Sequence, residues 1–465
     1  MAATFPGVIA FAFMGCMLLL GTVLRARFVL LQTALVPASL IGGLLGFGLI
    51  ATGWSFGFAS GDFTAFAFHL FTLSFMSLCL TGRERGSGQS VVPGGMWLSV
   101  VWVMSLVMQA LVGLGVVLGY NALTGGSLSP FLGMLVTHGF TQGPGQALAL
   151  GSIWQNGLGI EHAVSFGLIY ASVGFIVAFV LGVPIARHAI RAGLNFNRDA
   201  RIDADFLSGV YAPGNQVSAG RQITHAGNVD SLAFHLGILG VAYLLTDRYL
   251  TLMQPIASDW HLFGAGLGLI FSHDLFFFHG LLVCVLLRAL MDRLGWGRFI
   301  DDETQRRITG SAVDLMVVAT IMSIQLALLA QYLVPIVLVC VAVSLATWML
   351  CFGFGRRLGA LGVERAITAF GCCCGSTGTG LLLLRILDPN LSTSVARELA
   401  FFNIAILVLG FHVLTLMAPV LPSYSMPVII SVYAGTFVLG AVVLWWLGGR
   451  VPVPVRAAAN IPENS

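Results

Sequence analysis

The sequence has 465 residues, of which 57% are hydrophobic and only 9% are charged, and its mean hydropathy is +0.94. This composition excludes an ordinary water-soluble globular protein and predicts a membrane protein with many spanning helices. The formal net charge is only +3, and all 22 basic residues are arginine, so no nucleic-acid partner is expected.

The spanning helices are predicted from apolar runs, because about 20 consecutive apolar residues cross the hydrocarbon core of a bilayer. The first run, Gly7 to Leu24, has no basic segment before it and no small-residue cleavage site after it, which indicates a retained helix rather than a signal peptide. The predicted helices cover residues 7–24, 33–53, 63–81, 96–120, 163–187, 231–250, 262–288, 311–330, 332–354, 398–419 and 427–447.

Two further stretches, at about 130–155 and 366–388, are apolar but are interrupted near the middle by glycine and hydroxyl residues. We predict that each is a re-entrant hairpin, which enters the membrane and returns to the same side. Cytoplasmic loops of membrane proteins are enriched in basic residues. With the N-terminus outside, this arrangement puts 21 of the 22 arginines on the cytoplasmic side and only Arg248 outside. Counting either hairpin as a full span would invert every later loop and spoil that distribution.

The two hairpins share a sequence core, TQGPGQAL at Thr141–Leu148 and STGTGLLL at Ser376–Leu383. Their common pattern is Ser/Thr-x-Gly-x-Gly-x-x-Leu, and in each half a proline, Pro184 or Pro419, follows the first glycine of the core by 41 residues. We therefore predict an all-α polytopic fold of two inverted five-helix repeats, residues 1–189 and 230–420, each with one hairpin. A cytoplasmic linker, 190–229, joins them, and an extra helix with a cytoplasmic tail follows at 421–465.

The hairpin tips are the predicted binding site, because non-helical backbone inside a membrane is tolerated only where its polar groups face protein or water. Carbonyls and hydroxyls at a glycine-rich tip can ligate a cation, and the N-terminus of the returning half-helix attracts a carboxylate. The alternative is that the glycines only allow close helix packing. We predict a Na⁺ site formed by Thr141, Gly143, Ser376, Thr377 and Gly378, and substrate contacts from Gln142, Gly143, Gly145, Gln146, Asp274, Thr379, Gly380 and Arg385.

Two of these residues also have a simple structural interpretation. Asp274 lies in the middle of the predicted helix 262–288, beside His273 and five residues before His279. An ionisable residue there is a functional candidate, but it could equally pair with a histidine or mark a break in the helix. Arg385 could bind a substrate carboxylate through two hydrogen bonds or extend to the cytoplasmic surface.

The remaining polar residues favour packing roles, although His138, just before the first hairpin core, is open to either interpretation. Three adjacent cysteines cannot all face one metal ion from a helix, because successive side chains point about 100° apart. Small size at a packed hairpin is the better explanation for Cys372, Cys373 and Cys374, and no disulfides are expected among the eight cysteines. Single histidines on apolar helices, which we expect to be packed and hydrogen-bonded, are His69, His235 and His412.

Taken together, these features resemble the sodium/glutamate symporters, with the 2-hydroxycarboxylate (citrate) symporters as structural cousins. The resemblance covers most of residues 5–420 and shows in the hairpin cores, in VPASLIGGLLG at Val36–Gly46, in GLIYASVGFIVAFVLGVPIAR ending at Arg187, and in STSVARELAFFN after the second hairpin. The sequence departs from the family in the cysteine run GCCCGSTGTG and in the extra helix 427–447.

The resemblance implies Na⁺-coupled uptake of glutamate or a related small carboxylate by alternating access, with Na⁺ as coupling ion and no other cofactor. It further implies a homodimer in a bacterial inner membrane, in which one part of each protomer is a static scaffold and the part with both hairpins moves.

Three other functions remain open at this point. Proton coupling would use the buried Asp274 and its neighbouring histidines, whereas clustered carbonyl and hydroxyl oxygens favour Na⁺. An intramembrane enzyme would use the same residues as acid and base, but the sequence has no H-E-x-x-H or G-x-S-x-G motif. A sensor that keeps the fold without transporting is the third.

Overall fold

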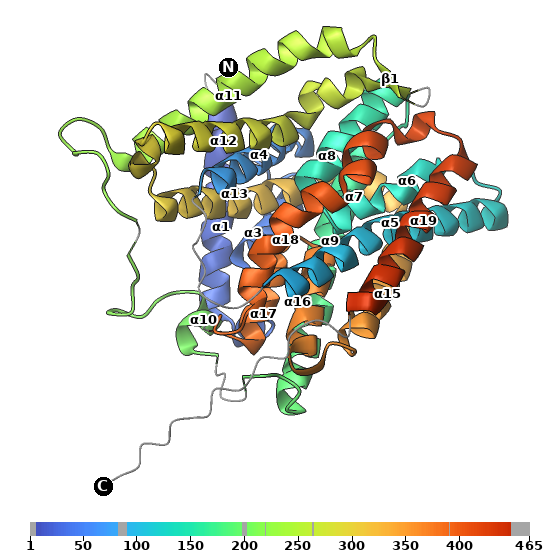
Figure 1. Cartoon of the computed structure of the whole chain (residues 1–465). Coiled ribbons are helices and arrows are strands. Elements are labelled where there is room, and N and C mark those ends of the chain that lie inside the picture. The colour runs from blue at the N-terminus through green and yellow to red at the C-terminus, as the bar shows by residue number, and fades with distance from the viewer. Residues whose placement is uncertain are drawn as a thin grey trace.

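The computed structural model describes residues 6–81, 91–197, 202–218, 220–262, 265–389 and 391–447, and almost all its elements are helices (Figure 1). The exception is a small antiparallel hairpin of β1 (His261–Leu262) and β2 (Ala265–Gly266), in which His261 pairs with Gly266. The expected all-helical membrane class is therefore confirmed.

The helices of the first half are α1 (Pro6–Arg27), α2 (Val29–Thr33), α3 (Ala38–Ala51), η1 (Ser60–Phe63), α4 (Thr64–Leu80), α5 (Val92–Thr124), α6 (Pro130–Met134), α7 (Val136–Phe140), α8 (Pro144–Ser152), η2 (Ile153–Gly157) and α9 (Ala163–Arg191). After the short linker helix α10 (Ala204–Ser208) come α11 (Ser231–Ala257), η3 (Leu267–Phe271), η4 (His273–Leu275), α12 (Phe276–Arg293), η5 (Trp296–Phe299), α13 (Asp302–Met322), α14 (Leu326–Gln331), α15 (Leu333–Gly355), η6 (Gly359–Leu361), α16 (Gly362–Cys374), α17 (Thr377–Leu387), α18 (Val395–Leu409), η7 (His412–Met417), η8 (Ala418–Ser423) and α19 (Met426–Leu447).

Within the described ranges, eight helices are long and apolar enough to cross a membrane, or nine if the bent pair of α18 and the following residues His412–Ser423 counts as one span. The sequence predicts eleven. The helix expected at 33–53 is only 14 residues long, because Pro37 fixes its start and it ends before Gly53, whose φ is +80°. The helix expected at 311–330 begins earlier, at Asp302, with a charged first turn, and ends at Met322.

Two other predicted helices are interrupted. The helix predicted at 262–288 is wrong in the first half of that range, where β2 and the 3₁₀ turns η3 and η4 precede α12. The stretch 398–419 bends by 51° after Leu409, next to Gly410, which is a common place for a helix to kink.

The helices form two groups. The first bundle consists of α1, α3, α4, α11, α12 and α13, which lie together along one side of Figure 1. Helices α1 and α3 approach closely because glycines face backbone: a Cβ at Gly21 would overlap the carbonyl of Ala38, and one at Gly42 would overlap that of Met17. Near the end of α4, the buried Ser77 donates a hydrogen bond to the side chain of Gln305 in the first turn of α13 (2.6 Å).

The hairpin bundle is organised around α5, the longest helix, and also contains α6–α9 and α15–α19. Helices α15, α18 and α19 and the segment α6–α7 all pack against α5, so that every residue from Trp97 to Val107 is buried. At Gly113 and Gly133 the backbones of α5 and α6 touch, since a Cβ at either residue would overlap the carbonyl of the other. Small residues thus allow close approach where lipid gives no hydrophobic drive for helix packing.

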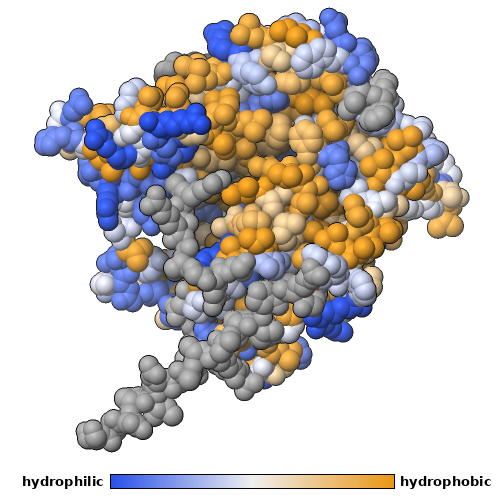
Figure 2. Space-filling view, viewed as in Figure 1, coloured by the Kyte–Doolittle hydropathy of each residue, from blue (hydrophilic) through white to orange (hydrophobic). Residues whose placement is uncertain are grey.

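The outer surface has the polarity expected of a membrane protein. In Figure 2, hydrophobic residues occupy the middle of the face shown and hydrophilic residues gather toward its edges. Large exposed apolar side chains come from helices of both bundles, including Leu244, Leu286, Val341, Val438 and Trp445.

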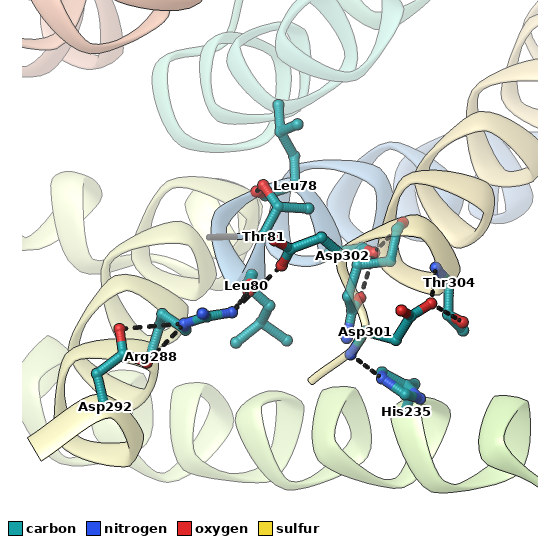
Figure 3. Close-up of polar contacts among 11 residues, drawn as sticks. Leu78, Leu80, Thr81, His235, Arg288, Asp292, Asp301, Asp302 and Thr304 are labelled. Carbon is teal, nitrogen blue, oxygen red and sulfur yellow. Dashed lines mark hydrogen bonds and ion pairs between the residues drawn. The ribbon is translucent and has the colours of Figure 1, made fainter. Parts of the chain in front are cut away.

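A cluster of polar side chains lies where α4 ends and α13 begins (Figure 3). Arg288 of α12 donates to the carbonyl of Leu80 (2.6 Å) and to the carboxylate of Asp292 (3.1 Å). Asp301 accepts hydrogen bonds from the backbone and hydroxyl of Thr304 (2.9 and 2.7 Å), and its own N–H donates to Nε2 of His235 (2.9 Å). Burial alone would raise the pKa of the Asp301 carboxyl, but hydrogen bonds from Thr304 and from the backbone of Arg221 hold it below its usual value. His235 is therefore a buried, hydrogen-bonded residue, as expected.

The linker between the halves contacts both bundles. The N–H of Phe196 donates to Oε1 of Glu364 at the start of α16 (2.6 Å). Ten residues later, the carbonyl of Phe206 accepts a hydrogen bond from Arg25 at the end of α1 (2.9 Å). The linker is thus attached to the hairpin bundle at one point and to the first bundle at the next.

We expect Gly42→Ala to destabilise the protein, because the added methyl group would force α1 and α3 apart. The matched control is Gly48→Ala on the same helix, where nothing lies within 4 Å of the new Cβ. Thermal unfolding in detergent should show a lower Tm for Gly42→Ala, from a loss of about 1–3 kcal/mol in the free energy of unfolding, and an unchanged or higher Tm for the control. Equal melting temperatures would contradict the close α1–α3 contact.

Candidate functional site

The first helical hairpin consists of α6 and α7 going in and α8 with η2 coming back. The break is at Thr141–Gly143. Gly143 has a φ of +87°, a backbone conformation that residues other than glycine rarely adopt, and Pro144 begins α8. Ring contacts between the arms show that the chain reverses direction. The ring of Trp154 on the returning arm lies 5.7 Å from that of His138 and 6.3 Å from that of Phe131 on the entering arm.

The second helical hairpin consists of α16 and α17 and reverses at Gly375 and Ser376. The Oγ of Ser376 accepts a hydrogen bond from the N–H of Thr379 (3.3 Å) and so caps α17. The two arms touch through glycines: a Cβ at Gly371 would lie 2.7 Å from Cα of Gly380, and one at Gly380 would overlap Sγ of Cys372. The small residues of this hairpin, including the three buried cysteines, therefore allow its arms to pack closely.

The tips of the two hairpins meet inside the hairpin bundle. A Cβ at Gly143 would lie 3.2 Å from the carbonyl oxygen of Gly375. Helix α9 passes the same point, because a Cβ at Gly174 would overlap the carbonyl of Cys374. Two breaks that are 232 residues apart in the chain (143 and 375) are thus neighbours in the fold.

Gln109 of α5 connects the two tips. Its Nε2 donates to the carbonyl of Cys373 (2.9 Å) and to the hydroxyl of Thr347 on α15 (2.9 Å), while its Oε1 accepts from the hydroxyl of Thr141 (2.7 Å). The indole N–H of Trp102, two turns earlier on α5, donates to the carbonyl of Thr141 (3.2 Å). One backbone carbonyl at each break, that of Thr141 and that of Cys373, therefore has a side-chain hydrogen-bond donor from α5.

Partial charges of both signs lie at the meeting point of the tips. Helices α8 and α17 both begin at the tips, and the free N–H groups of a helix N-terminus carry partial positive charge. The hydroxyls of Thr141 and Thr377 donate their hydrogens to amide oxygens of Gln109 and Asn403, which leaves their oxygen lone pairs available. Gly378 is exposed and a Cβ there would meet only Oγ of Ser376, at 3.6 Å, so there is free space beside this tip.

The structure brings together most of the residues predicted for the site. Thr141, Gln142 and Gly143 lie at the first tip, and Ser376, Thr377, Gly378 and Thr379 at the second. Gly145 faces the ring of Phe71 on α4, and Gly380 faces the other arm of its own hairpin, α16. At both positions, glycine allows the neighbouring segment to pack closely. Gln146, on the first turn of α8, has a shielded Oε1 without a hydrogen-bond partner.

Two predicted residues do not belong to the tips themselves. Arg385 is exposed in the last turn of α17, nine residues after Ser376. Asp274 is not in the middle of a helix, which corrects the expectation: it belongs to the 3₁₀ turn η4 that precedes α12. The structure thus agrees with the alternative interpretation, in which Asp274 marks a break in the helix. The adjacent His273 faces Asp247 of α11 at 3.4 Å, while His279 bonds to the carbonyl of Ile270 (2.8 Å).

The sequence analysis missed a buried ion pair at the base of the second hairpin. Arg365 of α16 donates to both carboxylate oxygens of Glu398 on α18 (2.8 and 2.7 Å), and each side chain is at most 3% exposed. Ser394 donates a third hydrogen bond to this carboxylate (2.8 Å). A Cβ at Gly94 would overlap the carboxylate, so glycine lets α5 pass directly over the pair. The pair therefore joins three helices of the hairpin bundle.

Comparison with known proteins identifies a family for this chain. The family model for the sodium/glutamate symporter matches residues 5–381, a range that includes both hairpin tips. No curated protein matches the chain. Helix α19 lies beyond the matched range and packs on α5, where Gly440 faces Met104.

We expect Glu398→Gln to lower the free energy of unfolding by about 3 kcal/mol or more, because it leaves the Arg365 charge buried without its partner. The control is Glu303→Gln, the same chemical change in an exposed pair with Arg306, which should have little effect. Denaturation in detergent measures both. If the two variants were equally stable, the buried pair would not hold the bundle together.

Proposed function

Because the chain belongs to the sodium/glutamate symporter family, whose members couple glutamate transport to Na⁺, we propose that it binds both where its two hairpin tips meet. The protein is a membrane transporter and not an enzyme. The observation that carries the proposed site is the contact between Gly143 and the carbonyl of Gly375, since it brings two helix N-termini and several unshared oxygen lone pairs to one place.

For Na⁺ we propose the oxygen atoms of Thr141, Gly143, Ser376, Thr377 and Gly378. Na⁺ is a hard cation that favours oxygen ligands, and hydroxyls whose hydrogens are already donated elsewhere present only lone pairs. The free space beside Gly378 supports access of an ion to the second tip.

For glutamate we propose the opposite polarity at the same place. Its carboxylates would be bound by the N–H groups at the start of α8 and α17, near Gln142 and Thr379. Bound Na⁺ would reduce the repulsion between the anionic solute and the tip carbonyls, which explains why the two would bind together.

We further propose that the two halves are inverted repeats. The pattern of helix contacts supports this: α1 packs on α3 as α11 packs on α12, and α3 packs on α13 as α12 packs on α4. Helix α4 also packs on α13, its own equivalent, as expected at a symmetry axis. The proposed topology, with the N-terminus outside and the linker in the cytoplasm, is supported by the polar cluster where α4 and α12 end and α13 starts.

Transport by alternating access would then be a displacement of the hairpin bundle against the first bundle. Both hairpins, α5 and α15 form one connected network through Gln109, so the proposed site would move as a unit. We propose that the first bundle is the static scaffold of a homodimer, and this proposal rests on the family resemblance.

Purified protein in liposomes should accumulate labelled glutamate with an inward Na⁺ gradient and not with K⁺; uptake independent of Na⁺ would overturn the proposed coupling.

We expect Gly143→Ala to abolish or strongly reduce uptake, because it strains a backbone at φ +87° and places a methyl group 3.2 Å from the carbonyl of Gly375. Gly159→Ala is the control, since Gly159 has a similar φ of +71° but nothing within 4 Å. Initial uptake rates in proteoliposomes, normalised to inserted protein, compare them. Equal loss in both variants would mean that backbone strain alone, and not the tip contact, reduces transport.

We expect Ser376→Ala and Thr377→Ala each to raise the Na⁺ concentration for half-maximal uptake about tenfold, which corresponds to the loss of one contact to a charged ligand. Thr246→Ala, which removes a buried hydroxyl of α11 in the first bundle, should leave the Na⁺ dependence unchanged. A normal Na⁺ response in both tip variants would move the cation site elsewhere.

A further inference from the structure

The first hairpin contains two buried hydrogen-bond acceptors without partners. His138 is 1% exposed, and its Nε2 has no hydrogen-bond partner. The shielded Oε1 of Gln146 is likewise unpaired. These residues flank the Thr141–Gly143 break, His138 one turn before Gln142 and Gln146 in the first turn of α8. A buried polar atom without a partner costs free energy, so both atoms favour a ligand that can donate to them.

The hydrogen bond on the other side of the imidazole determines what Nε2 can do. Nδ1 of His138 lies 2.5 Å from Oε1 of Gln142. An amide oxygen only accepts, so Nδ1 carries the hydrogen and Nε2 of the neutral ring has a free lone pair. The ring cannot easily turn away, because it packs edge to face against Trp154 at 5.7 Å. His138 is thereby oriented as an acceptor.

From these contacts we propose that His138 and Gln146 bind the α-ammonium group of the substrate. At neutral pH, glutamate has two carboxylates, which accept hydrogen bonds, and one ammonium group, which is its only strong donor. The helix N-termini at the tips suit the carboxylates, whereas the lone pairs of His138 Nε2 and Gln146 Oε1 suit the ammonium. This inference rests on the proposed site and adds a basis for selecting amino acids over dicarboxylates that lack the amine.

The test compares glutamate with glutarate, which has the same two carboxylates and no amine. In proteoliposomes, His138→Leu and Gln146→Leu should each raise the KM for glutamate about tenfold, the effect of losing one hydrogen bond to a charged group. Inhibition of uptake by glutarate and the Na⁺ concentration for half-maximal uptake should stay as in the wild type. His412→Leu, which removes an exposed histidine bonded to Thr436, is the control and should change none of these values.

The outcomes separate the alternatives. Equal loss of affinity for glutamate and glutarate would assign the two side chains a packing role and overturn the proposal, as would an unchanged KM for glutamate. A change in the Na⁺ response instead would make them cation ligands. If glutarate does not inhibit the wild type, a raised KM for glutamate with an unchanged Na⁺ response supports the proposal, and an unchanged KM overturns it. Failure of the wild type to take up glutamate would refute the proposed function itself, and the two single variants guard against one that does not fold.

Discussion

The arrangement depends on the requirement that backbone polar groups inside a membrane protein find partners. Each hairpin interrupts its helix and frees N–H and C=O groups at a depth where water is scarce. The fold meets this requirement by placing the two breaks against each other and by inserting Gln109, whose amide bonds to the carbonyl of Cys373 and the hydroxyl of Thr141. One side chain of α5 thus bonds to both tips, although the tips belong to different halves of the chain.

This requirement explains why the core of the hairpin bundle is so rich in small residues. A Cβ at Gly143 would lie only 3.2 Å from the carbonyl of Gly375, and α9 can pass beside the second tip because position 174 is glycine. The buried pair of Arg365 and Glu398 then fixes the base of the second hairpin to α18. Buried charges are costly unless they are paired and hydrogen-bonded, and here the carboxylate accepts three hydrogen bonds, one of them from Ser394.

Much of the fold could be predicted from the sequence because its signals are local. Long apolar runs give α1, α5, α9 and α15, and a glycine cluster within an apolar run gives each helix break. The family assignment and the transport function predicted from these motifs are confirmed. The roles of individual site residues stay predictions.

What the sequence could not give depends on distant partners. Gln109 is a single amide in an apolar helix, with no neighbouring pattern to mark it, and Arg365 and Glu398 are 33 residues apart. The mid-helix position predicted for Asp274 was wrong, and the alternative of a break there was right, because the apolar stretch continues through a segment that folds as β2 and 3₁₀ turns. Periodicity and composition cannot distinguish such a segment from a helix.

The two attachments of the linker also set a limit on distance. Phe196 is held by Glu364 on the hairpin bundle, and Phe206 by Arg25 on the first bundle. Ten residues of fully extended chain reach at most about 35 Å. While both attachments persist, the separation between these two points cannot exceed that contour length, whichever way the bundles slide. A covalent tether of fixed reach therefore runs between the parts, and shortening it by a few residues would reduce the available travel without touching any residue near the hairpin tips.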